Sequence, residues 1–243
     1  MRVLLRPLAW LAALALLPAC WAATAALART LPEAFLRPGG SILTPEGWAL
    51  LGGALLYALW HRVRPPEFLY TFAHELTHLL FALLWGKRVS RFEVSRGSGE
   101  VALSGTNPLI TLAPYFFPLP AAGVLLLGTL AEWAWGEPRL RLGTAALAGL
   151  ALALHVGMTW RALGSAQPDI ERGGRLFSWA VIYLAGALFV GGAALWAAGG
   201  GGALLAFGRR LGEEIFWAYA WAGPRLLEAL DRGAAWVSER WGA

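Results

Sequence analysis

The chain has 243 residues, of which 58% are hydrophobic and only 14% are charged. Soluble domains carry about a quarter charged residues, so this composition excludes an ordinary soluble enzyme and predicts an all-α polytopic membrane protein. The net charge of +5 comes from arginines in short groups between apolar segments. Such groups are typical of helix ends that face lipid headgroups, and they argue against nucleic-acid binding.

The first apolar segment, residues 7–28, follows Arg2 and Arg6. It has the roughly 20 residues that a helix needs to cross a bilayer. A basic start followed by an apolar core also describes a signal peptide. The apolar stretch continues past Cys20, so we favour a retained membrane helix. Because Cys20 is the single cysteine, an internal disulfide framework is excluded.

A proline pair separates the next two apolar segments. Residues 47–63 form a second, short candidate helix, which Pro65 and Pro66 end. Proline is tolerated at a helix N-terminus, so a third helix is expected over about 67–85. This third helix carries the sequence TFAHELTHLLF at 71–81.

After the third helix the pattern changes to the alternation of a strand. Apolar residues alternate with polar ones on both sides of the turn sequence Gly-Ser-Gly at 97–99. This pattern predicts a short β-hairpin over 91–104, directly after the helix that carries HELTH.

A proline-rich apolar segment follows at 108–135. It contains Pro114, Pro118 and Pro120 in the sequence LAPYFFPLP. Proline removes a backbone donor and clashes with the preceding turn, so this helix is expected to be kinked or broken. The prolines could let the helix move as a gate, or they could break it where water must reach a buried site.

Two further helices and a tail complete the chain. Apolar helices are expected over 140–164 and 176–198, with the second ended by the glycines at 199–202. The sequence thus predicts about six transmembrane helices in one bundle over residues 1–202. The segment 203–243 mixes Arg, Glu and Trp with apolar residues, which is typical of an amphipathic tail on a membrane surface.

The chemistry of the HELTH sequence follows from helical spacing. His74 and His78 are four residues apart, so both can direct a ring nitrogen to one ion. Glu75 is close enough to act as a general base on a water bound to that ion. The alternative is a polar helix face exposed to water, but an apolar membrane helix offers no such water.

A catalytic zinc ion takes three protein ligands, so one further ligand is needed. The chain has two aspartates, Asp169 and Asp231, and Asp169 follows an apolar helix at a proline break in the sequence QPDI. Glu132, Glu213 and Glu214 are the rivals. We favour Asp169 because a carboxylate at such a break can be directed back into the bundle.

His155 is the remaining histidine inside an apolar helix. It precedes Asp169 by fourteen positions, which is about 21 Å along a straight helix. We therefore expect His155 to be a packed, hydrogen-bonded histidine, and not a ligand of the same ion.

HELTH, the β segment after it, PYFFPLP and QPDI together resemble the site-2 protease class of intramembrane zinc metalloproteases, in its small bacterial branch. The resemblance covers about residues 66–175 and lacks a PDZ insertion. It implies that Zn²⁺ is bound by His74, His78 and Asp169, and that Glu75 activates water. QPDI differs from the family's aspartate followed by glycine.

The resemblance implies a zinc-dependent intramembrane endopeptidase that hydrolyses peptide bonds in or near transmembrane segments. The partners are then the lipid bilayer and a membrane-protein or peptide substrate, in a bacterial cytoplasmic (inner) membrane. The hairpin offers an edge on which an unwound substrate could add as a strand, although it can equally be a plain connecting turn. The alternatives are a catalytically silent binding or regulatory protein, a membrane zinc-handling protein, and a zinc protease with a glutamate as third ligand. The sequence leaves the oligomeric state open.

Overall fold

Helices make up most of the chain. A computed structural model describes residues 2–37, 42–164 and 167–241. The elements are α1 (Arg2–Phe35), α2 (Pro45–Val63), α3 (Glu67–Leu84), β1 (Val89–Ser95), β2 (Ser98–Leu103), α4 (Pro108–Phe116), α5 (Leu119–Trp135), α6 (Arg139–Leu163), α7 (Pro168–Arg172) and α8 (Arg175–Trp241). The predicted helical protein with a hairpin directly after the HELTH helix is therefore confirmed.

Fewer helices than the sequence predicted have the length and apolar composition of a membrane span. In the described residues, three helices are long and apolar enough to cross a membrane, or four if the bent pair α4–α5 is one span. The expected six spans are not confirmed, because α2 and α3 are not among these helices. α3 has 18 residues, which is about 27 Å, and polar HELTH residues interrupt its apolar surface.

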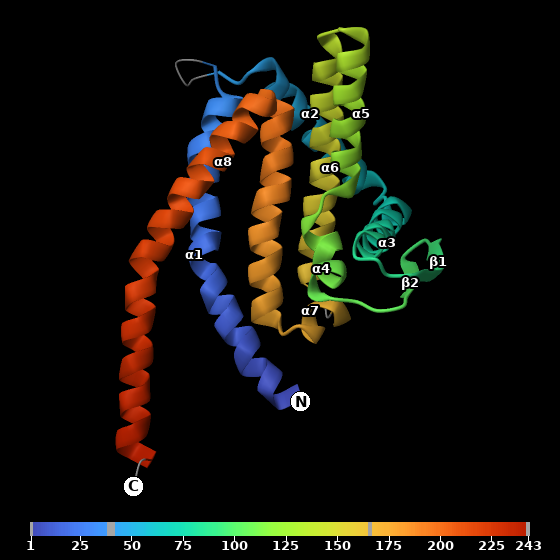
Figure 1. Ribbon diagram of the computed structural model, residues 1–243. Coiled ribbons are helices and arrows are strands. Elements are labelled where there is room, and N and C mark those ends of the chain that lie inside the picture. The colour runs from blue at the N-terminus through green and yellow to red at the C-terminus, as the bar shows by residue number, and fades with distance from the viewer. Residues whose placement is uncertain (1, 38–41, 165–166, 242–243) are drawn as a thin grey trace.

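Figure 1 shows how the helices are arranged. α1 lies beside α8, while α2 and α5 pack against α6. Glycines bring α2 and α6 together at the level of the backbone, since a Cβ atom on Gly53 would collide with the Ala146 carbonyl. A Cβ atom on Gly149 would likewise collide with the Leu50 carbonyl. Small residues allow this close approach of membrane helices.

The break predicted in 108–135 is present. Asn107 caps α4 by accepting a hydrogen bond from the Ile110 N–H at 2.8 Å. α4 ends at Phe116, and α5 begins at Leu119 with a bend of 70° between them. Pro114 lies inside α4 and does not end it, so the bend falls at Phe117 and Pro118.

The glycines at 199–202, at which the sequence predicted the end of this helix, interrupt α8. The backbone leaves the helical region only at Gly200, with φ 67° and ψ −159°. A second helical arm starts there and runs back along α1 (Figure 1). Phe207 on this arm is buried against Ala26, and the Tyr219 hydroxyl donates a 2.7 Å hydrogen bond to the Ala15 carbonyl. That this arm rests on a membrane surface stays a prediction.

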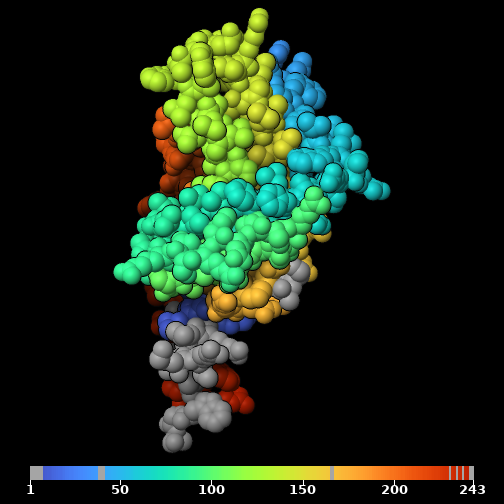
Figure 2. Space-filling view, turned by 90° about the vertical axis from the view of Figure 1, so that its right-hand side faces the viewer, coloured from blue at the N-terminus to red at the C-terminus, as the bar shows by residue number. Residues whose placement is uncertain are grey.

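α3 and the hairpin form a separate layer on one side of the bundle. α3 is seen almost end-on in Figure 1, whereas α5 and α6 run upright, and the hairpin is the outermost element. The space-filling view in Figure 2 shows the same layer crossing the middle of this face. Phe92 of β1 contacts Phe72 of α3 edge to face at 6.2 Å, which attaches the hairpin to α3.

Candidate metal centre

α3 places the HELTH side chains at the boundary between the bundle and the hairpin. The rings of His74 and His78 lie 4.9 Å apart between centroids, on the same helix face, as the four-residue spacing predicts. Both are half-buried. Thr71 and Thr77 are buried on either side of His74, and each hydroxyl donates to a backbone carbonyl of the preceding turn of α3.

The orientation of His78 depends on a proline in α4. Its Nδ1 lies 2.9 Å from the Ile110 carbonyl oxygen, so Nδ1 carries a proton and Nε2 is the nitrogen that could bind a metal. In a regular helix that carbonyl would accept from the N–H of residue 114. Because residue 114 is Pro114, which has no N–H, the carbonyl is available to His78.

Asp169, on the short helix α7, lies beside Nε2 of His78. Its Oδ2 lies 3.6 Å from that nitrogen. One ligand atom each from His74, His78 and Asp169 lie within 4.8 Å of one another. Two ligands of a tetrahedral zinc ion are about 3.4 Å apart, so two imidazoles and one carboxylate at this spacing fit zinc with little movement.

Other polar groups surround the Asp169 carboxylate. The Tyr115 hydroxyl donates to Oδ2 at 3.4 Å, and the Arg172 guanidinium lies 3.8 Å from Oδ1. Burial alone would raise the pKa of Asp169, but a hydrogen bond from His78 and the charge of His78 lower it. With the charges of His74 and Arg172 added, the net pKa lies below its usual value. The carboxylate is therefore held in the charged form that a metal requires.

Glu75 lies against the hairpin. A Cβ atom added to Gly99 of β2 would lie 2.8 Å from Glu75 Oε1, so only glycine leaves room for this carboxylate. Both residues line a cavity of about 470 Å³. The cavity is also lined by His74, His78, Glu100, Val101, Leu103, Gly105, Thr106, Thr111, Gln167, Asp169 and Arg172. The three candidate ligands, the candidate base Glu75 and strand β2 thus line the same cavity.

The structure separates the rival residues from this cavity. Glu132 lines a different cavity of about 150 Å³ together with Arg141. Glu214 pairs with Arg29 on α1 at 2.5 Å. His155 is buried in the bundle and is not part of the metal-sized group, as expected.

Some residues around the site were not predicted from the sequence. Tyr115 and Gln167 lie in the sequences PYFFPLP and QPDI, but no local pattern assigned either side chain to the site. Tyr70 precedes His74 by four positions, and its hydroxyl lies 3.5 Å from His74 Nδ1. Helical spacing could have identified this neighbour.

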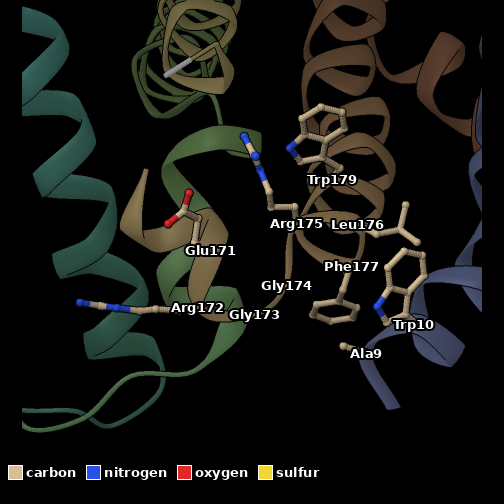
Figure 3. A pocket seen from close by; sticks show the side chains of 10 residues that line it. All are labelled: Ala9, Trp10, Glu171, Arg172, Gly173, Gly174, Arg175, Leu176, Phe177 and Trp179. Carbon is tan, nitrogen blue, oxygen red and sulfur yellow. The ribbon is translucent and has the colours of Figure 1, made fainter. Parts of the chain in front are cut away.

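Another cavity lies on the other side of α7, at the start of α8 (Figure 3). It has a volume of about 940 Å³ and is lined by Ala9, Trp10, Glu171, Arg172, Gly173, Gly174, Arg175, Leu176, Phe177 and Trp179. In Figure 3, Arg172 points away from the indole of Trp10. None of the candidate metal ligands lines this cavity.

Comparison with known proteins agrees with the resemblance drawn from the motifs. The family model described as Peptidase M50B-like matches residues 48–166, a segment that contains α3, the hairpin and the α4–α5 break. The match ends just before Asp169. No curated protein and no solved structure matches the chain. Through residues 48–166, the chain belongs to a site-2 protease family.

Proposed function

We propose that the protein is a zinc-dependent endopeptidase that hydrolyses peptide bonds in or near transmembrane segments of membrane proteins. The observation that carries this proposal is one cavity of about 470 Å³ lined by His74, His78, Asp169 and Glu75. The family and the apolar helices support a membrane protease. The dependence on zinc and the substrate class go beyond these observations and belong to the proposal.

The proposed roles follow from the positions of the side chains. His74, His78 and Asp169 hold the metal. When bound, zinc supplies a Lewis acid that lowers the pKa of a coordinated water towards 7. The Glu75 carboxylate takes a proton from the attacking water and later gives it to the leaving amine. Tyr115 keeps Asp169 in place through its hydroxyl.

The hairpin is proposed to position the substrate. A peptide bond inside a helix is hidden by its own hydrogen bonds, so a membrane segment must unwind before it is cut. In the described residues, β2 pairs with β1 alone, and several β2 residues line the cavity. An extended substrate segment would add to the outer edge of β2 through main-chain hydrogen bonds.

The first test is metal content of the full chain purified in detergent. We expect about one zinc per wild-type chain, and loss of zinc in His74→Ala and Asp169→Ala. Glu132→Ala is the matched control, since it removes a carboxylate outside the site, and it should keep its zinc. Zinc lost from Glu132→Ala and kept by Asp169→Ala would overturn the ligand assignment.

The second test separates an enzyme from a silent or zinc-handling relative. Purified protein is incubated with fluorescently labelled single-span membrane peptides in the same detergent. Wild type should release fragments, and Glu75→Gln should retain zinc and bind peptide without cutting it. If zinc-loaded wild type binds peptides and cuts none, the protease proposal fails and the silent binding protein takes its place.

A further inference from the structure

His155 on α6 is a buried histidine with half of its hydrogen-bonding capacity unused. Its exposed fraction is 8%. One ring N–H bonds to the Tyr115 backbone. The other nitrogen, Nε2, has no hydrogen-bond partner among the described residues. Buried polar atoms are nearly always satisfied, so this nitrogen needs an explanation.

The bond to Tyr115 depends on the proline-rich break between α4 and α5. In a continuing helix, the Tyr115 carbonyl would accept from the N–H of Leu119. At the break, the Leu119 N–H instead bonds the Phe117 carbonyl at 2.8 Å. The Tyr115 carbonyl is therefore available to His155. The same segment also orients His78 through the Ile110 carbonyl, so the break serves two histidines.

A small cavity connects His155 with His74. It has a volume of about 20 Å³ and is lined by Tyr70, Ala73, His74, Thr77, Pro114, Phe117, Pro120, Leu154 and His155. About 10–15 Å³ is enough for one water molecule, provided that two to four polar groups surround it. His155 Nε2, His74 Nδ1 and the Tyr70 hydroxyl can supply these groups.

His74 Nδ1 has only a long hydrogen bond on this side. The distance from its Nδ1 to the Tyr70 hydroxyl is 3.5 Å, which is long for a hydrogen bond. If Nε2 of His74 is used for a metal, Nδ1 carries the proton and requires an acceptor. A water in the cavity provides that acceptor and can donate one of its own protons to His155 Nε2.

We propose that His155 is a positioning residue that holds His74, through one buried water, in the orientation needed to bind zinc. The inference rests on the proposed zinc centre and adds to it a residue outside the ligand set. His155 touches neither substrate nor metal. It acts because a ligand histidine is oriented by the partner of its second nitrogen, and loss of such a partner weakens metal binding about 10–100-fold.

The test is zinc affinity, measured by competition with a chelator on the full chain in detergent. His155→Met keeps much of the volume without a nitrogen, and we expect zinc affinity about 10–100-fold below wild type. His155→Gln keeps an acceptor and should restore most of this loss. His61→Met is the matched control, because it removes a histidine on α2 outside the site, and its affinity should equal that of wild type.

A second variant tests the role of the same water without changing His155. Ala73→Val adds two methyl groups to a residue that lines the cavity, so the water has less room. Zinc affinity should fall as in His155→Met. Thermal unfolding of the metal-free variants is measured in parallel. A purely structural role would lower the unfolding temperature of His155→Met and His155→Gln alike, and would leave the zinc affinity of the folded protein unchanged.

The outcomes distinguish this inference from the proposed function. Wild type that binds zinc, with His155→Met and Ala73→Val binding it equally well, would overturn the positioning role alone. Wild type that binds no zinc would overturn the metal centre and this inference with it. A weaker affinity in both variants, with rescue in His155→Gln, would establish the water-mediated contact.

Discussion

A single methyl group on the hairpin should slow catalysis about 10²-fold without removing the metal. The Cβ atom of Gly99→Ala would lie 2.8 Å from Glu75 Oε1, whereas ordinary van der Waals contact begins at 3.4 Å. The carboxylate must therefore move by at least about 0.6 Å, and further at Cγ, where the contact is closer. A displacement near 1 Å costs about 10²-fold in rate, or about 2.7 kcal/mol.

The assay compares kcat for peptide hydrolysis with zinc content in the same sample. We expect kcat of Gly99→Ala to fall about 10²-fold. Zinc content should stay at the wild-type level because Glu75 is not a ligand. Gly105→Ala is the matched control: Gly105 also lines the cavity, but its added Cβ would meet only Lys87, at 3.9 Å. Unchanged kcat in Gly99→Ala would refute Glu75 as the base.

Three further predictions concern other parts of the structure. Pro114→Ala restores an N–H that competes for the carbonyl bonded to His78, so zinc affinity should fall about 10–100-fold in a chelator titration. The lowered pKa of Asp169 adds stability above its ordinary pKa of about 3.9. That stability is lost as pH falls through the lower folded-state pKa, so thermal unfolding of metal-free Asp169→Asn should depend less on pH in this range. Gly149→Ala should lower stability by about 1–3 kcal/mol through a clash with α2, while Gly123→Ala, whose added Cβ meets nothing within 4 Å, should not.

Local patterns predicted the parts of the structure that local interactions determine. The alternation around Gly97 predicted the hairpin, and Gly97 has a φ of 79°, which suits glycine in a tight turn. The prolines predicted the break between α4 and α5. The spacing of His74 and His78 predicted that they share a face, because helical periodicity depends on the backbone alone.

Tertiary packing determined the parts that the sequence did not predict. Hydropathy suggested that the HELTH helix crosses the membrane, yet α3 lies across the bundle in Figure 1. The second arm of α8 along α1 depends on contacts such as that of Arg210 with Glu33, at 2.7 Å, between residues far apart in the chain. Asp169 was favoured from its position at a break, and the structure brings it to the histidines. That it binds metal stays a prediction.

The partners of the site residues had almost no signal in the sequence. The Ile110 carbonyl is a backbone group, which every residue carries. Only Pro114, four positions later, indicates that this carbonyl lacks its usual partner. Tyr115 and Gln167 are 52 positions apart and meet because α4 packs against α7.

The distribution of the three candidate ligands along the chain has a consequence for biosynthesis. His78 leaves the ribosome 91 positions before Asp169. At about 5–20 residues per second, this delay is roughly 5 to 20 s. During that time a nascent chain has two imidazoles and no carboxylate partner, and the helix that must carry Asp169 to them has not been made. A newly inserted chain therefore cannot bring its three candidate ligands together until α6 and α7 have been synthesised.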